Sequence, residues 1–251
     1  MALPSRSVDA RIAVVTGGGT GIGRAVAAAL AGRGDQVVIL GRRAEVLERA
    51  AAELGVRWRQ ADVTRRQDVQ AAVDWVLAEV GPTVDVLVNN AGGAGGVPDG
   101  ATLEEAERAW DEVVDGNLKS AFLMSWATLP HLRRPGGRIV NVGSVAAWSG
   151  RGGPYTAAKA GVAGLTYWLA LDLGPEGITV NAVAPGFIEA TEFFGGGPSE
   201  EGRRSRVAQI PAGRPGRPEE VAAAVAYLTS PEAAYVNGEV HHVNGGWLFG
   251  R

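Results

Sequence analysis

A tyrosine and a lysine four residues apart are the side chains in this sequence best suited to moving a proton. Tyr155 and Lys159 lie in the segment Tyr-Thr-Ala-Ala-Lys, which begins a predicted helix, so both side chains lie on one face of it. A tyrosine hydroxyl titrates near pH ~10, and a neighbouring ammonium lowers that pKa toward neutral pH. We therefore expect Tyr155 to act as a general acid or base, although tyrosine–lysine pairs more often serve packing and surface charge.

The scarcity of lysine favours the catalytic interpretation. The chain has two lysines, Lys119 and Lys159, and uses arginine at its other strongly basic positions. Arginine at position 159 would keep the positive charge, but its wide planar fork differs from the compact ammonium that can hold a ribose hydroxyl. Although Lys119 shows that lysine also occurs outside this motif, the choice of lysine at position 159 indicates a specific role.

Two further polar residues are candidates for the same site. Ser144 follows the predicted strand Arg138–Val142, and ten residues separate it from Tyr155. A strand end and a helix start can then face one carbonyl oxygen from two sides, although a lone serine after a strand is more often a turn or helix cap. Asn117 lies within a long helical stretch, where asparagine is unfavourable, so we expect a local distortion or a buried role there.

A glycine-rich turn offers a place for a phosphate. The segment Thr-Gly-Gly-Gly-Thr-Gly-Ile-Gly directly follows the first predicted strand and opens the first predicted helix. Without side chains, the turn can bring backbone N–H groups against a pyrophosphate, and the helix N-terminus adds free donors. Glycines also serve tight turns that bind nothing, but this context favours a dinucleotide site formed by Gly17, Gly19, Thr20, Gly21, Ile22 and Gly23.

The residue after the second predicted strand bears on the choice of dinucleotide. Dinucleotide-binding folds place the group that reads the adenosine ribose at this point, and here it is Arg42. An acidic residue would bind a free 2′-hydroxyl, whereas arginine offers a charge-assisted fork to a 2′-phosphate, so NADP (NADPH) is favoured over NAD. Plain surface charge is the alternative role of Arg42.

After the fourth predicted strand, the small residues around Asn90, Ala91 and Gly92 would let the backbone approach the adenosine and its ribose.

The elements that must position these residues follow the pattern of repeated βαβ units. Short apolar runs alternate with helix-period segments from residue 11 onward. We predict an α/β fold with one domain over residues 1–251, a doubly wound Rossmann fold whose seven-stranded parallel sheet is flanked by helices. The strands are expected to be wholly apolar, because helices cover both faces. They are predicted at Ile12–Val15, Gln36–Leu40, Arg57–Gln60, Val84–Val88, Arg138–Val142, Thr179–Ala182 and Glu239–Val243, and the helices near Gly21–Arg33, Ala44–Leu54, Arg66–Glu79, Leu103–Leu129, Tyr155–Leu173 and Glu219–Thr229.

An irregular stretch departs from this alternation. Residues 187–218 carry three consecutive glycines and several prolines. The stretch is either a flexible surface insertion or a lid, because loops at the carboxyl ends of parallel strands lie over the ligand. We predict a substrate lid over approximately residues 187–218.

The composition argues against several other kinds of chemistry. The 251 residues carry a formal charge of −3, no cysteine and three histidines. Without cysteine there is no disulfide scaffold, thiol nucleophile or thiolate metal site, and no metal site is expected. The chain lacks long basic runs, a signal-peptide pattern and any apolar run of about eighteen residues, so we expect a cytoplasmic protein without nucleic-acid or membrane partners.

Taken together and in order, the motifs resemble those of the short-chain dehydrogenase/reductase family. The glycine turn matches that family's TGxxxGxG spacing, and the pair Tyr155 and Lys159 matches its YxxxK motif. The resemblance implies hydride transfer between a nicotinamide cofactor and a carbonyl or secondary alcohol. It makes Tyr155 the proton donor, Ser144 the group that stabilises charge on the oxygen, and Lys159 the residue that orients ribose and tunes Tyr155. It also implies that Asn117 supports a water-mediated proton path.

The resemblance assigns further cofactor contacts. Asp62 and Val63 match the family's adenine-contacting pair, although Asp62 is equally suited to cap the following turn. The family's segment that fixes the nicotinamide carboxamide is matched by Pro185, Gly186, Ile188 and Thr191, the threonine coming one residue later than usual. Family members also pair two long helices across a two-fold axis, which implies a homotetramer, with a dimer as the alternative.

Among the branches of the family, the chain looks most like the 3-oxoacyl-acyl-carrier-protein reductases. Those enzymes often carry arginine where this chain has Glu176, which would repel an acidic carrier protein, while Arg133 and Arg134 could supply part of a carrier patch. The small-molecule carbonyl or alcohol substrate is therefore either carrier-bound or free, as for a ketoreductase or alcohol dehydrogenase of secondary metabolism. A dinucleotide-binding sensor without turnover is a further alternative.

An aromatic pocket for the substrate is also possible from the sequence, and the candidates to line it are Trp148, Phe193, Phe194 and Trp247.

Overall fold

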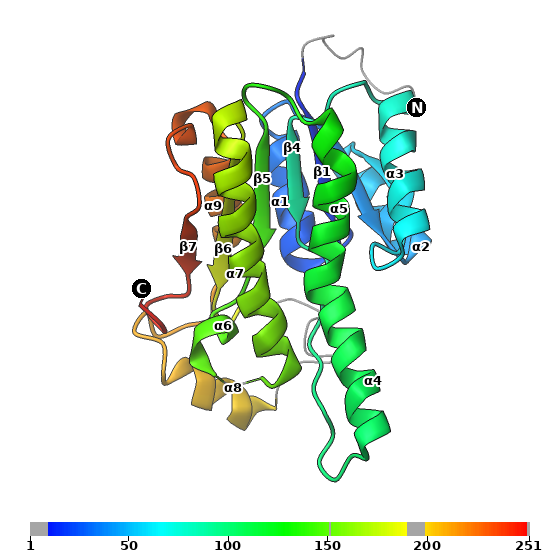
Figure 1. The fold of residues 1–251 in the computed structure, drawn as a ribbon. Coiled ribbons are helices and arrows are strands. Elements are labelled where there is room, and N and C mark those ends of the chain that lie inside the picture. The colour runs from blue at the N-terminus through cyan, green and yellow to red at the C-terminus, as the bar shows by residue number, and fades with distance from the viewer. Residues whose placement is uncertain (1–9, 151, 190–198, 250–251) are drawn as a thin grey trace.

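A seven-stranded, wholly parallel sheet forms the centre of the molecule (Figure 1). The computed structural model describes residues 10–150, 152–189 and 199–249. The strand order, β3-β2-β1-β4-β5-β6-β7, reverses direction between β1 and β4, as in doubly wound folds. The predicted fold class is confirmed. The strands are β1 Ile12–Thr16, β2 Gln36–Gly41, β3 Arg57–Gln60, β4 Val86–Asn89, β5 Arg138–Val142, β6 Thr179–Pro185 and β7 Val240–Val243.

Helices cover both faces of the sheet (Figure 1). On one face α3, α5 and α7 pack against alternate strand residues such as Val14 and Ile139, and on the other face α1, α2 and α9 pack against residues such as Val15 and Val140. No helix among the described residues is both long and apolar enough to span a membrane. The α-helices are α1 Gly21–Ala31, α2 Ala44–Leu54, α3 Arg66–Glu79, α4 Leu103–Val114, α5 Ser120–Thr128, α6 Ala146–Ser149, α7 Pro154–Leu173, α8 Glu200–Val207 and α9 Pro218–Leu228.

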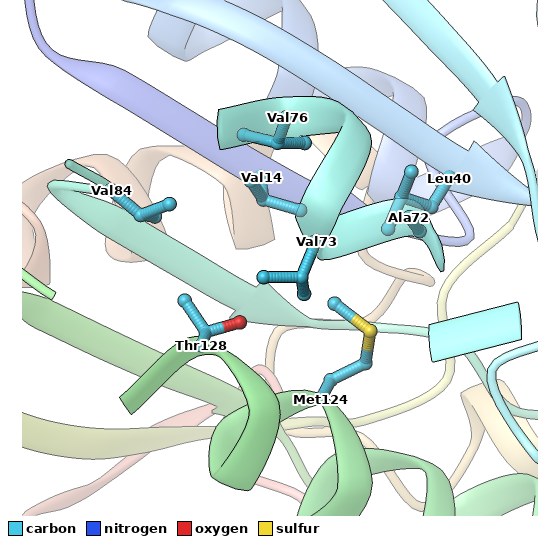
Figure 2. Close-up of a pocket in the computed structure, with 8 residues that line it drawn as sticks. All are labelled: Val14, Leu40, Ala72, Val73, Val76, Val84, Met124 and Thr128. Atoms are coloured by element: carbon cyan, nitrogen blue, oxygen red, sulfur yellow. The ribbon is translucent and has the colours of Figure 1, made fainter. Parts of the chain in front are cut away.

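The core between the sheet and the helices α3 and α5 is closely packed. Figure 2 shows side chains from β1, β2, α3 and α5 around a small apolar space. Met124 and the neighbouring valines leave no room there for a water molecule. The hydroxyl of Thr128 faces this region and has no hydrogen-bond partner. The space is a packing feature of the core rather than a ligand site, and the tight packing supports the strands that end at the candidate site.

Several elements differ from the sequence-based prediction. Strand β4 begins at Val86, because Val84 makes only an isolated bridge to Leu132. Strand β3 is not wholly apolar, since it reads Arg-Trp-Arg-Gln and lies at the edge of the sheet, where one side has no neighbouring strand. The short helix α6 and the helix α8 were not predicted; α8 has few apolar residues and contains a glycine, so its sequence lacks the periodicity of a packed helix.

The predicted long helix Leu103–Leu129 is divided by a π-helix. Residues Asp115–Lys119 form this wider turn between α4 and α5, and Asn117 lies within it with 3% of its surface exposed. The π-turn widens the helix and turns the asparagine inward, as often occurs at functional sites. Both the distortion and the burial expected at Asn117 are confirmed.

The ends of the predicted lid are held together by backbone pairing. Ile188 and Gly216 form a parallel bridge, in which Gly216 donates to the Phe187 carbonyl oxygen at 2.9 Å and Glu189 donates to the Gly216 carbonyl oxygen at 3.0 Å. Within the stretch, Ser199 caps α8 by accepting a hydrogen bond from Gly202 N–H. Residues 190–198, and with them Thr191, Phe193 and Phe194, lie outside the described residues. A lid over residues 187–218 stays a prediction.

Candidate active site

The carboxyl end of β5 and the start of α7 bring a serine and a tyrosine together. Ser144 follows β5 and accepts a hydrogen bond from the Ala146 N–H at 3.1 Å, which begins the short helix α6. The chain then returns to start α7 with Pro154 in its first turn, a position that proline favours because its ring presets the helical φ. Tyr155 follows Pro154 and forms a side-chain hydrogen bond with Ser144. Two hydroxyl groups therefore meet at the edge where a doubly wound sheet binds its ligand.

Lys159 lies behind this hydroxyl pair, one helical turn after Tyr155. The lysine is 4% exposed, and its Nζ donates to the Val142 carbonyl oxygen at 2.8 Å. The same Nζ lies 5.7 Å from the centroid of the Tyr155 ring. The hydrogen bond fixes the ammonium between the end of β5 and the tyrosine. Sequence reasoning did not identify the Val142 carbonyl as a partner, because a main-chain acceptor has no side-chain signature.

The expected lowering of the tyrosine pKa by the lysine is wrong for this structure. Burial raises the pKa of Tyr155 to about 12, and the hydrogen bond with Ser144 offsets this only in part. Burial also lowers the pKa of Lys159 to about 8. Both groups lose hydration of their charged form, and this desolvation outweighs the attraction that sequence spacing suggested. The phenol is therefore protonated at neutral pH, and in this structure it is a weaker acid than a tyrosine in water.

Asn117 and Lys159 both lie close to Gly92. The Asn117 amide donates to the Val113 and Gly93 carbonyl oxygens at 2.9 and 3.0 Å, and its Oδ1 accepts from Gly93 N–H at 3.3 Å. A Cβ added at Gly92 would lie 2.5 Å from Asn117 Oδ1 and 3.5 Å from Lys159 Nζ. The structure thus groups the π-helix, the segment after β4 and α7 at one place, and Gly92 is required there because a side chain would collide with the asparagine.

The glycine turn is shaped to receive a phosphate-bearing group. Gly17 and Gly21 have positive φ angles of 65° and 51°, which favour glycine. A Cβ at Gly23 would lie 2.2 Å from the Gly17 carbonyl oxygen, so the helix start packs against the turn with no space for a side chain. Helix α1 has no side-chain cap at Thr20 and no acidic residue in its first turn. Free N–H donors and an uncompensated positive helix end fit an anion such as a pyrophosphate.

The segment after β4 is tied to this turn by one threonine. Thr16 Oγ1 accepts from the N–H groups of Asn90 and Ala91 at 3.0 and 2.9 Å. In return, the Asn90 amide donates to the carbonyl oxygens of Thr16 and Gly17 at 2.9 and 3.2 Å. Asn90, Ala91 and the glycine turn therefore form one surface. Thr16 was not among the expected site residues, although its place at the end of β1 was a signal for such a contact.

The residues expected to read the adenosine lie at the carboxyl ends of β2 and β3. Arg42 is exposed directly after β2, and its carbonyl oxygen accepts from Gln60 Nε2 at 2.8 Å. Asp62 accepts from both the N–H and the hydroxyl of Thr64, at 3.1 and 2.8 Å. Burial alone would raise the pKa of Asp62, but the bonds from Thr64 and the charge of Arg42 outweigh it and lower that pKa. Asp62 caps the turn that carries Val63, which is 7% exposed.

The segment expected near the nicotinamide lies beside the serine. The Val145 N–H donates to the Pro185 carbonyl oxygen at 3.1 Å, and Gly186 N–H donates to the Val243 carbonyl oxygen at 3.0 Å. A Cβ at Gly186 would lie 2.9 Å from Asn244 Cα, so glycine is needed for this close approach. Ile188 is 5% exposed and anchors the base of the predicted lid.

An aromatic pair joins α6, the short helix that follows Ser144, to β7. Trp148 on α6 lies four residues after Ser144 and is 37% exposed. Its ring contacts that of His242 on β7, with ring centroids 5.1 Å apart. Sequence reasoning proposed Trp148 as a pocket residue but missed His242, because β7 is brought to this place only by the sheet order. Burial lowers the pKa of His242.

The burial of Lys159 predicts a pH-dependent stability. In the unfolded chain the ammonium has its ordinary pKa of 10.5, whereas in the folded protein the pKa is about 8. Below pH 8 the buried charge costs the folded state about 3 kcal/mol, and this cost falls as the pH rises from 8 to 10.5. We expect Lys159→Met to unfold at a higher urea concentration than wild type at pH 7. The gain in stability is reduced by the loss of the hydrogen bond to Val142, and it should disappear by pH 10.

The control for this experiment is Lys119→Met, which removes the other lysine from an exposed position where it pairs with Asp115 at 2.9 Å. Urea unfolding is measured for the three proteins at pH 7 and pH 10. A difference between wild type and Lys159→Met that stays the same at both pH values would contradict the assigned cost of burying this charge.

Fold and site together define a class of enzyme. The doubly wound parallel sheet places a serine, a tyrosine and a buried lysine at its carboxyl edge, together with a glycine turn suited to bind a phosphate. A protein with this fold and site is an oxidoreductase of the CH–OH/C=O couple. The family model described as "Enoyl-(Acyl carrier protein) reductase" matches residues 17–248. The chain belongs to the short-chain dehydrogenase/reductase family.

Characterised relatives match the chain over nearly its whole length. A 3-oxoacyl-[acyl-carrier-protein] reductase, FabG, of Vibrio cholerae is 40% identical over 247 residues, which cover 96% of this chain and 98% of the relative. The short-chain reductase protein NovJ of Streptomyces niveus is 42% identical over 249 residues, covering 94% and 93%. Among solved structures, an actinorhodin polyketide ketoreductase variant with NADPH superposes with a TM-score of 0.85 at 37% identity, covering 97% of this chain and 99% of that one. These relatives are named as a 3-oxoacyl-[acyl-carrier-protein] reductase, a short-chain reductase and a polyketide ketoreductase, and this chain is a ketoreductase of the same family.

Proposed function

We propose that this protein is an NADPH-dependent ketoreductase that converts a small-molecule ketone to a secondary alcohol. The observation that carries the proposal is the hydrogen-bonded pair of Ser144 and Tyr155, with the ammonium of Lys159 fixed behind it. A substrate carbonyl oxygen that lies between the two hydroxyls would break their hydrogen bond and accept one hydrogen bond from each of them. Tyr155 is protonated at neutral pH, as the donor of a proton to a carbonyl oxygen must be.

Each polar residue has a separate role in this proposal. Tyr155 gives its proton to the carbonyl oxygen as that oxygen becomes negative, and Ser144 holds the same oxygen in place. Lys159, 5.7 Å from the tyrosine ring, stabilises the phenolate that is left. Asn117, which is hydrogen-bonded to Gly93, lies where it can order a water molecule next to Lys159. Through this water and the lysine, a proton would return to Tyr155.

The residues fit a nicotinamide dinucleotide. When bound, NADPH supplies the hydride that the carbonyl carbon receives. The glycine turn and the free end of α1 would hold its pyrophosphate, Asp62 and Val63 its adenine, and Arg42 its 2′-phosphate. The surface formed by Asn90, Ala91 and Gly92 would lie along the adenosine and ribose. Pro185, Gly186 and Ile188, together with Thr191, would position the nicotinamide end.

The role of Arg42 predicts a change of cofactor preference. A charge-assisted pair with phosphate contributes about 1.5–3 kcal/mol, so we expect Arg42→Asp to lower kcat/KM for NADPH by roughly 10- to 100-fold. The activity with NADH should fall much less or rise, because the new carboxylate can accept from a free 2′-hydroxyl. Steady-state kinetics with both cofactors provide the measurement. Arg49→Asp, the same charge change at an exposed position on α2, should leave the preference unaltered.

A free substrate is favoured over a carrier-bound one. The two arginines expected to attract a carrier protein both have carboxylate partners, since Arg133 pairs with Asp85 and Arg134 pairs with Glu176. Neither side chain therefore offers an unneutralised charge to an acidic partner. A carrier-independent ketone of secondary metabolism agrees better with this surface than a 3-oxoacyl carrier protein does. The half-exposed Trp148 beside the serine suits a substrate with a flat apolar part.

An exposed aromatic cluster supports a homo-oligomer, the homotetramer or dimer that the family resemblance implies. Phe122 and Trp126 on α5 and Trp168 on α7 stack on one another with ring centroids 5.8 to 6.5 Å apart, and Trp126 is 55% exposed. Leu171 on α7, 78% exposed, extends the same apolar face. A contiguous apolar face of this kind usually meets a partner, and a second copy of the chain is the partner that the family resemblance implies. A cytoplasmic location and the lack of nucleic-acid or membrane partners stay predictions of the sequence.

The proposed activity is tested by following the absorbance of NADPH with a panel of free ketones, a 3-oxoacyl thioester and an enoyl thioester. We expect oxidation of NADPH with free ketones, weaker activity with the 3-oxoacyl thioester and none with the enoyl compound. If NADPH binds tightly but is not oxidised by any compound, the alternative of a non-catalytic dinucleotide sensor replaces the proposal.

A further inference from the structure

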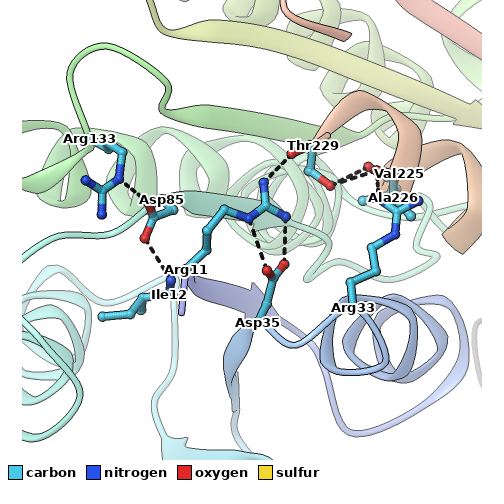
Figure 3. A network of polar contacts seen from close by, with 9 residues as sticks. All are labelled: Arg11, Ile12, Arg33, Asp35, Asp85, Arg133, Val225, Ala226 and Thr229. Carbon is cyan, nitrogen blue, oxygen red and sulfur yellow. Dashed lines mark hydrogen bonds and ion pairs between the residues drawn. The ribbon is translucent and has the colours of Figure 1, made fainter. Parts of the chain in front are cut away.

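The amino edge of the sheet, opposite the candidate active site, carries arginines that are matched with acceptors. Arg11 binds Asp35 through two hydrogen bonds of 3.1 and 2.9 Å and donates to the Thr229 carbonyl oxygen at 2.6 Å (Figure 3). Arg133 pairs with Asp85 in the same region (Figure 3). Each of these guanidinium groups is therefore compensated by a carboxylate.

Arg138 at the same edge is an exception. It is the first residue of β5, only 6% of its surface is exposed, and its Nη1 donates to the Gly137 carbonyl oxygen at 3.0 Å. Its Nε is buried without a hydrogen-bond partner, and among the described residues no carboxylate lies within ion-pair distance of it. The Nε side of a guanidinium is the one that matches the two oxygens of a carboxylate or phosphate. In Arg138 this side is left unpaired.

The charges around Arg138 leave it uncompensated. The Asp85 carbonyl oxygen accepts the Arg138 N–H at 2.9 Å, but the Asp85 carboxylate is already used by Arg133 and by the Ile12 N–H at 2.8 Å. Burial, and after it the positive charge of Arg11, lower the pKa of Arg138. A buried cation without a partner is costly, so this place favours a negative charge.

A second unpaired polar group lies next to this guanidinium. Thr179, the first residue of β6, is the register partner of Arg138 and is likewise 6% exposed. Its N–H donates to the Gly137 carbonyl oxygen at 3.1 Å, but its hydroxyl is buried without a partner. Register partners on parallel strands point to the same face of a sheet. Val140 and Val183 further along these strands face α9, which places both unpaired groups on that side.

We propose that Arg138 and Thr179 form a binding site for a small oxyanion, a phosphate or a carboxylate, at the amino edge of the sheet. The Nε side of Arg138 would hold two of its oxygens, and the Thr179 hydroxyl would donate to one of them. The bound anion would neutralise the excess positive charge next to Arg11 and tie the starts of β5 and β6 together. The site lies at the other end of the strands from the glycine turn, so it is separate from the proposed cofactor site.

Arg57 provides a matched comparison. It begins β3, and its Nε is also buried without a partner, while its Nη1 donates to the Glu79 carbonyl oxygen at 2.9 Å. Its side chain is only half-buried, however, so water reaches the rest of the guanidinium. Arg57→Met therefore removes an equivalent unpaired group without affecting the proposed site.

The test is urea unfolding of the whole protein in increasing sodium phosphate, with sodium chloride added to keep the ionic strength constant. In wild type we expect a saturable stabilisation, with the unfolding constant about tenfold lower at ~ten times the Kd for phosphate. Arg138→Met should lose the saturable part, Thr179→Val should require more phosphate, and Arg57→Met should behave as wild type. Phosphate bound at the glycine turn is common to all four proteins, so the difference between wild type and Arg138→Met isolates this site.

Equal saturable stabilisation of wild type and Arg138→Met would overturn the proposal. Equal stabilisation by chloride alone would also overturn it, because chloride lacks the two separate oxygens that match the fork. If Arg138→Met does not fold, Thr179→Val decides: a phosphate response identical to that of wild type overturns the site, and a weaker one supports it.

Discussion

Replacing Tyr155 by phenylalanine is expected to lower kcat for ketone reduction by roughly 10²–10⁴-fold, with little change in the affinity for NADPH. The phenol is the group placed to give a proton, and the hydroxyl that forms a hydrogen bond with it is that of Ser144. A serine hydroxyl is a far weaker acid than a phenol. The ring itself is retained in the variant, so the packing of α7 against α6 should be preserved.

The matched control is Tyr167→Phe, which makes the same change on the same helix at a tyrosine that is 46% exposed. Its kcat should stay within a factor of about two of wild type. Cofactor binding by calorimetry and turnover by NADPH absorbance separate the two effects. A Tyr155→Phe variant that keeps more than about a tenth of the wild-type kcat would remove the tyrosine from its assigned role.

Replacing Gly23 by alanine is expected to raise the Kd for NADPH by roughly 100-fold or more. The new methyl group would lie 2.2 Å from the Gly17 carbonyl oxygen and 2.4 Å from Asn90 Nδ2. Because the first of these is backbone, the turn itself must open, and with it the surface that Asn90 helps to form. The expected loss exceeds that of the Arg42 variant because several phosphate contacts shift together.

Gly19→Ala is the control within the same turn. Its Cβ would meet Val46 Cγ1 at 3.0 Å and Leu47 Cδ2 at 3.4 Å, which are ends of flexible side chains. Its Kd should rise by less than about tenfold. Circular dichroism establishes that each variant is folded before calorimetry measures binding. Native affinity in a folded Gly23→Ala variant would show that the close approach to Gly17 is not needed.

The fold could be predicted from the sequence because its signals are local and repeated. The alternation of strand-length runs with helical segments predicted all seven strands, the polar edge strand β3 among them, and the glycine turn at the end of β1 indicated where the first helix begins. The limits of this reasoning appear at the ends of elements. Val84 is apolar and was assigned to a strand, yet it makes only one bridge, since pairing depends on a neighbouring strand that the local sequence does not reveal.

The candidate site was predictable in its residue types but not in its electrostatics. Asn117 carried a signal, because an asparagine in the middle of a helix required an explanation, and the π-helix supplies it. The pKa of Tyr155 carried no such signal, since spacing placed a lysine near it while burial of the phenol decided the direction of the shift. The partners of Arg138 and the contact of Trp148 with His242 depend on strand order and were likewise not accessible to pattern reasoning.

The bridge between Ile188 and Gly216 has a consequence for how enzymes of this kind diversify. Since it joins the two ends of the intervening segment, that segment can be lengthened, shortened or exchanged for a foreign one at small entropic cost, and the strands below do not have to adjust. If this segment covers the substrate as predicted, evolution or an engineer can change the substrate range at this insertion point while the proton-transfer residues keep their geometry.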